Sequence, residues 1–339
     1  MSLSTNVSLS TNILSLSLKN YFEQNKIQRD LPVNFTLNDA HLTVNDSNTV
    51  TPSKQELVVF DDLSLENLLT LQSHCHLSID ALLAINTRNN QTSYRFNVSC
   101  NDFIKSRQAL ADFALAKKIE AALIHNAPKL NEPGLLVMDM DSTTIEIECI
   151  DEIAKLAGVG EQVSAVTELA MQGELDFAQS LHQRVATLEN APEQILADVA
   201  KNIPLMAGLE TLISELKKHH WRIAIASGGF TYFADHLKEM LALDAAFANV
   251  LEITDGKLTG RVLGNVVDAQ VKADSLSILA QKYQISPSQT VAMGDGANDL
   301  VMMAAAGFGV AFHAKAIVLA QADSSINQQG LDCLLHWLA

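Results

Sequence analysis

The stretch Leu135–Asp141 constrains the fold of this chain more than any other. It reads LLVMDMD, a short apolar run that ends in two aspartates one residue apart, and hydroxyl residues follow at 142–144. Four to eight apolar residues between turn formers are typical of a buried strand in a parallel sheet. Carboxylates at the carboxyl end of such a strand lie where open α/β sheets bind ligands. Because burying unpaired charge is costly, we expect Asp139 and Asp141 to form a metal-assisted nucleophilic site.

The charge of the chain limits its partners. It has 339 residues and a formal net charge of -16. This length suits two domains with a sizeable core. The basic surface needed for non-specific binding to nucleic acid or to an anionic membrane is missing, so neither is expected as a partner. If the substrate is an anion, a metal or well-placed Lys and Arg side chains must supply local positive charge.

The sequence pattern predicts no membrane-spanning segment, no secretory signal and no disulfide bonds. The longest apolar run, residues 300–312, is too short to span a bilayer. The start, residues 1–12, lacks the basic residues and the continuous apolar centre of a secretory signal, so we interpret it as a frayed leader. The four cysteines show no CxxC spacing and are expected to be free thiols. A cytoplasmic location follows as the expectation.

Residues 1–128 are predicted to form a separate, small α+β domain. Helical spacing occurs over residues 65–71 and 79–85, and again over 101–126, which we expect to connect to the next domain. Strand patterns occur at residues 34–45, 55–60 and 93–100.

Residues 129–339 are predicted to form an α/β core built on a doubly wound parallel sheet. Directly after the first strand, residues 146–204 show helical spacing without an intervening strand pattern, which indicates a helical cap over the strand ends. Three of the expected strands end in polar, glycine-bearing loops, as a sheet with one ligand crevice requires. Further strands are expected at residues 221–226, within 249–262, at 290–293 and at 309–312.

The two aspartates after the first strand suit phosphoryl transfer. Asp139 can attack phosphorus as a carboxylate nucleophile and give an aspartyl-phosphate. Asp141 can protonate the leaving oxygen and then take a proton from the hydrolytic water. Since adjacent acids repel each other's charge, one of them can stay protonated long enough to donate.

Three later segments supply the positive charge and the anion-binding groups. Ser227 and the amides after it suit phosphate oxygens, and Lys272 adds a point charge. Asp295, with Asn298 or Asp299 near it, completes an oxygen site that favours Mg²⁺. Each segment alone is weakly specific, but chance rarely places all of them on successive strand ends.

Four motifs form the ordered set: DMDSTT at 139–144, SGG at 227–229, Lys272 and GDGANDL at 294–300. This set resembles the haloacid dehalogenase superfamily of aspartate-nucleophile phosphatases. Three further segments are ECIDEIA at 148–154, FAQSLHQRV at 177–185 and IASGGF at 225–230. They resemble the phosphoserine phosphatase family, and the resemblance covers roughly residues 134–338.

The resemblance implies a haloacid-dehalogenase-like fold and Mg²⁺-dependent hydrolysis of O-phospho-L-serine to L-serine and phosphate, the last step of serine biosynthesis. It implies a metal held by Asp139, Asp295 and the backbone carbonyl of Asp141. Some members carry small amino-acid-binding domains before the first motif, so regulation and assembly, for instance as a homodimer, are the roles considered for residues 1–128. The implied substrate contacts are Glu148, Arg184, Ser227, Gly228, Lys272 and Asn298.

The cap residues fit a substrate that is an amino acid. Glu148 can bind the ammonium group of phosphoserine and Arg184 its carboxylate, which separates an amino acid from a sugar phosphate. Glu146 competes with Glu148 for the ammonium group.

Three alternatives remain open at this point. The same chemistry could act on another small phosphomonoester, or transfer the phosphoryl group to an alcohol. The chain could also be a serine-binding module with an inactive core, although intact Asp139, Asp141, Lys272 and Asp295 speak against this.

Overall fold

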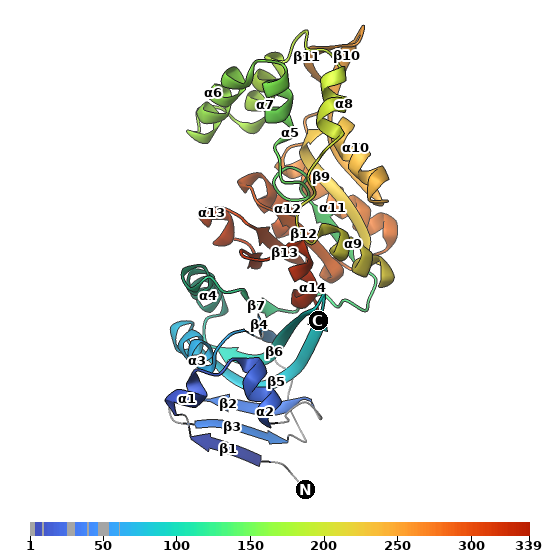
Figure 1. Ribbon diagram of the computed structural model, residues 1–339. Helices are drawn as coiled ribbons and strands as arrows, with labels where there is room; N and C mark the ends of the chain where they lie inside the picture. The colour runs from blue at the N-terminus through green and yellow to red at the C-terminus, as the bar shows by residue number, and fades with distance from the viewer. Residues whose placement is uncertain (1–3, 9, 26–30, 39–40, 47–53, 61) are drawn as a thin grey trace. The chain divides into compact units, whose positions relative to one another are not determined.

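The computed structural model describes residues 4–8, 10–25, 31–38, 41–46, 54–60 and 62–339 (Figure 1). The chain divides into two compact units. Unit 1 comprises Met1–Ala127 together with Asp323–Ala339, and unit 2 comprises Pro128–Ala322. Within the described ranges, no helix has both the length and the apolar character needed to cross a membrane.

Unit 1 combines an antiparallel sheet with helices. Its elements are β1 (Ser4–Ser8), α1 (Thr11–Leu14), α2 (Leu18–Asn25), β2 (Val33–Leu37), β3 (His41–Asp46), β4 (Gln55–Phe60), α3 (Leu65–His74), β5 (Leu77–Arg88), β6 (Gln91–Cys100), α4 (Phe103–Lys117), β7 (Ala121–His125), β14 (Ser324–Ile326), η3 (Leu331–Cys333) and α14 (Leu334–Trp337).

The strand order in this sheet is β1-β3-β2-β5-β6-β4-β7. The run β4-α3-β5-β6-α4-β7 is a βαββαβ motif, and β1-α2-β2-β3 has the order of its first half. Side chains alternate between the two faces of each strand. On β6, Tyr94, Phe96 and Val98 join the core formed with the helices, while Ser93 and Arg95 face the other side.

The C-terminal segment covers that other face. The buried guanidinium of Arg95 donates hydrogen bonds to the carbonyl oxygens of His336 (3.0 Å), Trp337 (3.0 Å) and Leu338 (2.8 Å). Residues 323–339 therefore belong to unit 1, whereas the sequence boundary assigned them to residues 129–339. The hydrophobic spacing of the sequence does not reveal that residues 323–339 pack on unit 1. The hydrogen bonds of Arg95 go to backbone carbonyl groups, which every residue has and which leave no sequence pattern.

Three local expectations for unit 1 were wrong. Residues 79–85 are not helical but lie in β5, which pairs with β6, because a short apolar run fits either period and strand pairing decides. The helix expected over 101–126 ends at Lys117, and β7 follows and pairs with β4. The expected frayed leader contains β1, which pairs with β3.

Unit 2 alternates strands and helices. Its elements are β8 (Leu135–Met138), α5 (Cys149–Leu156), α6 (Gly160–Met171), α7 (Phe177–Ala186), α8 (Gln194–Ala200), α9 (Leu209–Lys218), β9 (Arg222–Phe230), α10 (Thr231–Met240), β10 (Ala245–Thr254), β11 (Lys257–Leu263), α11 (Ala269–Tyr283), η1 (Pro287–Gln289), β12 (Thr290–Gly294), η2 (Ala297–Asp299), α12 (Leu300–Ala305), β13 (Phe308–Phe312) and α13 (Ala316–Leu319).

Its strands follow the order β11-β10-β9-β8-β12-β13. All of these pairs are parallel except β10–β11. Helices α11 and α12 pack on one face of the sheet, and α9 and α10 contact β9. Because the chain moves outward from β8 in both directions, β8 and β12 flank the point where the strand order reverses. The predicted doubly wound core is confirmed.

Helices α5 to α8 follow β8 without an intervening strand and form the cap of the fold. α7 packs on α6 and on β11, so the β10–β11 hairpin supports the cap from the sheet side. α7 begins at a capping box in which Asp176 and Gln179 bond each other's backbone N–H groups.

Candidate active site

Three parallel strands deliver polar residues to one edge of the sheet in unit 2. Asp139 follows β8, Ser227 and Gly228 lie near the end of β9, and Asp295 follows β12. β8 pairs in parallel with both β9 and β12, so the three carboxyl ends are neighbours. This edge coincides with the reversal of strand order, where open α/β sheets form their ligand crevice.

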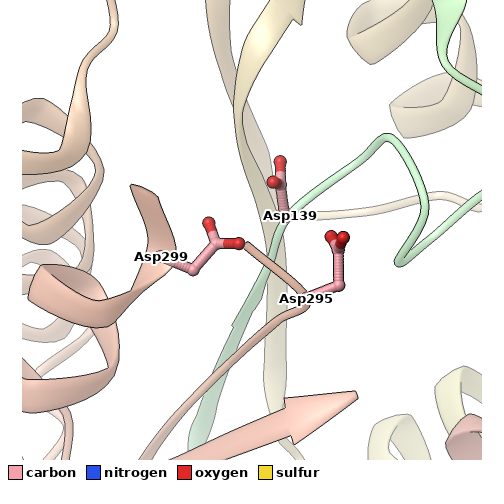
Figure 2. A group of neighbouring side chains, drawn as sticks. All are labelled: Asp139, Asp295 and Asp299. Carbon is pink, nitrogen blue, oxygen red and sulfur yellow. The ribbon is translucent and has the colours of Figure 1, made fainter. Parts of the chain in front are cut away.

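Asp139, Asp295 and Asp299 form an acidic group at this edge (Figure 2). One carboxylate oxygen from each lies within 4.8 Å of the others, and Asp139 and Asp299 are buried. Burial, with the charge of Asp139, raises the pKa of Asp295 and of Asp299. Crowded carboxylate oxygens of this kind fit a hard divalent cation, which would relieve their repulsion.

Lys272 lies against the acidic group and is fully buried. Its Nζ is 2.8 Å from Oδ2 of Asp139 and 2.7 Å from Oδ1 of Asp299. Burial by itself lowers the pKa of Lys272, but the charges of the two carboxylates outweigh it and raise the pKa above its ordinary value. Asp268 caps the start of α11 by accepting the N–H of Val271, which fixes where Lys272 lies.

Asp141 lies in a different environment from Asp139. Its Oδ1 accepts a hydrogen bond from the N–H of Cys149 at 3.1 Å. Burial, followed by the charges of Glu148 and Asp139, raises the pKa of Asp141 to about 8. At neutral pH this carboxyl group therefore keeps a proton that it can donate. The side chain of Asp141 is not part of the acidic group, in which Asp299 is the third member.

The loop at the end of β9 needs its two glycines. The Oγ of Ser227 accepts the N–H of Gly229 at 2.8 Å. A Cβ at Gly228 would lie 2.5 Å from Cζ of Phe177 on α7, and one at Gly229 would lie 2.8 Å from Oδ2 of Asp141. The absence of side chains thus lets the cap and the proton donor approach the loop.

A cavity of about 590 Å³ lies between the strand ends and the cap of unit 2. The residues to which the sequence analysis assigned a catalytic, metal-binding or substrate-binding role line this cavity, except Glu146, Lys272 and Asp299. Lys272 contacts the carboxylates of Asp139 and Asp299 at the base of the site. Side chains predicted from five separate segments are therefore brought together around one space.

Two cap residues of opposite charge face the cavity. Oε1 of Glu148, at the start of α5, accepts a hydrogen bond from Oγ of Ser142 at 2.7 Å. Burial lowers the pKa of Arg184 on α7, and among the described residues its Nε has no hydrogen-bond partner. A guanidinium group with a spare donor fits a carboxylate ligand.

Sequence reasoning gave no role to three polar residues that support the site. Oγ1 of Thr143 donates to Oδ1 of Asp295 at 3.2 Å, and Oγ1 of Thr144 donates to the carbonyl oxygen of Asp139 at 2.5 Å. Both threonines follow the Asp-Met-Asp motif directly, and that position was the available signal. Asn249, on β10, hydrogen bonds the Gly228 loop and lies outside every motif.

Residues 134–307 match the family model of the haloacid dehalogenase-like hydrolases. The match covers more than half of the chain and includes all the strand-end residues described above. This chain belongs to the haloacid dehalogenase-like hydrolase family.

Relatives within that family share a narrower description. The chain is 61% identical over 216 residues to the phosphoserine phosphatase of Vibrio cholerae, and the aligned part spans 64% of this chain and 66% of that protein. A crystal structure described as a probable phosphoserine phosphatase from Vibrio cholerae, in its unliganded form, is 47% identical, with a TM-score of 0.70 and coverage of 86% of this chain and 88% of that one.

A third relative is a structure described as a phospho-aspartyl intermediate analogue of phosphoserine phosphatase. It is 42% identical to this chain, with a TM-score of 0.58, and covers 61% of this chain and 100% of that one.

Proposed function

We propose that this protein is a phosphoserine phosphatase that hydrolyses O-phospho-L-serine to L-serine and phosphate through an aspartyl-phosphate. One observation carries the proposal. Asp139, paired with Lys272, and Asp141, whose pKa is raised to about 8, line the same cavity as Glu148 and Arg184. The relatives named phosphoserine phosphatase support the choice of substrate.

In the first step, a carboxylate oxygen of Asp139 forms a bond to phosphorus as the bond from phosphorus to the seryl oxygen breaks. Asp141 gives its proton to that leaving oxygen, so L-serine departs as the neutral alcohol. The raised pKa of Asp141 supports this role, since the carboxyl group must be protonated beforehand.

In the second step, water attacks the phosphorus of the aspartyl-phosphate. The carboxylate of Asp141 takes one proton from this water, the bond from phosphorus to the Asp139 oxygen breaks, and phosphate leaves. Asp139 is then a free carboxylate and Asp141 is protonated again, so both residues are ready for another cycle.

Charge on the phosphate is balanced by the chain and by a cation. We propose Mg²⁺ at the acidic group, held by Asp139, Asp295 and the backbone carbonyl of Asp141. When bound, this ion would supply positive charge to the phosphate oxygens. The proposed protein contacts to the phosphate come from Ser227, Gly228, Lys272 and Asn298.

The amino-acid end of the substrate is proposed to lie against the cap. Glu148 would accept hydrogen bonds from the ammonium group, and Arg184 would pair with the carboxylate. A phosphate ester without these groups would form neither contact with the cap, so phosphoserine would be preferred.

We also propose a cytoplasmic location. All four cysteines are free, as expected for a reducing compartment.

Replacing Asp139 by asparagine tests the nucleophile. A carboxamide at this position cannot form an acyl-phosphate, so we expect phosphate release from L-phosphoserine to fall by at least about 10³-fold, with the thermal unfolding temperature little changed. Chelation with EDTA should abolish the activity of the unaltered protein, and added Mg²⁺ should restore it. An Asp139→Asn protein with undiminished turnover would refute the proposed chemistry. Equal turnover with and without EDTA would refute the proposed cation.

A further inference from the structure

The Ser227 loop is a bulge in β9. Phe247 on β10 is paired with Ala226 on β9, and Asn249 is paired with Phe230. Three residues of β9, 227 to 229, therefore stand opposite the single residue Ala248. Bulges of this kind interrupt the ladder, and the backbone groups in them need other partners.

The side chain of Asn249 supplies hydrogen bonds to backbone groups in the bulge. It is 2% exposed. Its Nδ2 donates to the carbonyl oxygen of Gly228 at 2.8 Å and to that of Gly229 at 3.3 Å, while its Oδ1 accepts the N–H of Val267 at 2.8 Å. Two acceptors on one side and a donor on the other fix the orientation of the amide.

These bonds join two parts of the site that are far apart in sequence. Gly228 and Ser227 belong to the loop at the end of β9. Val267 comes just before Asp268, the residue that caps α11 and thereby fixes Lys272. One buried amide thus connects the loop proposed to bind phosphate with the start of the helix that carries the lysine.

We propose that Asn249 is a positioning residue for the phosphoryl group: it holds the Ser227–Gly229 bulge and the start of α11 in one fixed arrangement. The inference rests on the proposed phosphatase activity. Asn249 does not line the cavity, so it acts through the backbone of Gly228 and Gly229 and through Val267. Small displacements of groups that orient a reacting centre are costly in rate.

Asn249→Asp tests this role with almost no change in size. The carboxylate can still accept from Val267, but it cannot donate to the carbonyls of Gly228 and Gly229 and would repel them. We expect kcat to fall about 10- to 100-fold. The fall should be equal for L-phosphoserine and p-nitrophenyl phosphate, because the loop serves the phosphate that both share.

Gln289 provides the matched control. It is also a buried amide in unit 2, with Oε1 accepting the N–H of Lys129 at 2.7 Å and Nε2 donating to the carbonyl oxygen of Lys129 at 3.1 Å. It precedes β12, at the edge of the sheet opposite to the site. Gln289→Glu should lower the unfolding temperature and leave kcat unchanged when assayed well below that temperature.

The two variants separate positioning from general stability. An unchanged kcat in Asn249→Asp, or an equal loss of kcat in Gln289→Glu, would overturn the inference. If Asn249→Asp is too unstable to assay, Asn249→Ser replaces it. A serine is too short to reach both the Gly228–Gly229 carbonyls and the N–H of Val267, so kcat should fall here as well. An unchanged kcat in Asn249→Ser would overturn the inference. If the unaltered protein hydrolyses neither ester, it is the proposed function that fails.

Discussion

In unit 2, two nearby aspartates have different neighbours, which suit one to act as nucleophile and the other as proton donor. Asp139 lies 2.8 Å from the ammonium group of Lys272 and forms an ion pair with it. Two residues later, burial and nearby negative charge raise the pKa of Asp141 to about 8, which favours the protonated form. Two acids of the same chemical type thus have different surroundings: Asp139 is paired with a cation, whereas Asp141 is buried beside anionic groups.

Selectivity for the amino-acid end is a prediction at this scale. Arg184→Gln and Glu148→Gln should each lower kcat/KM for L-phosphoserine by roughly 10- to 100-fold, the cost of losing a charged hydrogen-bond partner. The loss on p-nitrophenyl phosphate should be small, because that ester has neither an ammonium nor a carboxylate group. Equal losses on the two esters would show that these cap residues do not read the amino-acid end.

His336, in unit 1, gives a prediction about pH and stability. Its ring nitrogens contact Oγ of Ser93 (2.8 Å) and the carbonyl oxygen of Arg88 (3.2 Å). Burial, with the charge of Arg88, lowers the pKa of His336 to about 4. Below pH 6.5 the unfolded chain gains a proton that the folded protein does not bind. Stability should therefore fall as pH drops from 6.5 towards 4, by about 3 kcal/mol from this residue.

Urea unfolding across that pH range measures the effect. The change in unfolding free energy should be smaller in His336→Gln than in the unaltered protein by about that amount. His182→Gln, at an exposed position on α7, should follow the unaltered protein. Parallel pH profiles for His336→Gln and the unaltered protein would contradict the prediction.

At the scale of elements, the sequence predicted strands best where burial alone determines the hydrophobic pattern. β8 and β12 are buried on both faces, so they appear as short apolar runs, and their ends could be predicted. Of the predicted site residues, Asp139 follows β8 and Asp295 follows β12. Residues 79–85 of β5 were mistaken for a helix because the burial of β5 stops alternating after its first five residues, and the short apolar run that remains fits either period.

Other features depend on tertiary pairing and leave no local pattern. Asn249 is recognised by its bonds to the backbone of Gly228, Gly229 and Val267, and backbone groups are the same at every residue. Asp299 was considered beside Asn298 from the spacing of the last motif, but only the structure shows its contact with Lys272. The sequence thus indicated several of the groups that line the cavity, but not Asp151 or Lys315, which line it too, and not Asn249, which lies behind it.

At the scale of the whole molecule, unit 1 is discontinuous: unit 2 is inserted between Ala127 and Asp323. Buried polar groups of the first part depend on the last. Besides Arg95, the buried carboxylate of Glu120 accepts backbone N–H groups from Asn327, Gln328 and Gln329. Burial raises the pKa of Glu120, and these three bonds oppose that rise.

Deleting residues 334–339 tests this dependence. Arg95 would keep its ion pair with Glu56 but lose its three carbonyl acceptors, and each lost hydrogen bond to a charged group costs about 1.5–3 kcal/mol. Calorimetry should show the unfolding of unit 1 at a lower temperature, with phosphatase activity of unit 2 retained below it. An unchanged unfolding profile would mean that the segment contributes little to unit 1.

The split of unit 1 also sets an order of events during translation. Residues 1–127 leave the ribosome before unit 2, but the strand and helices that complete unit 1 leave only after all of unit 2. Until residues 323–339 are synthesised, Arg95 and Glu120 lack the backbone partners that this segment supplies. Unit 1 therefore cannot complete its folding before that point. Unit 2, whose segments are contiguous, can mature before the domain that precedes it.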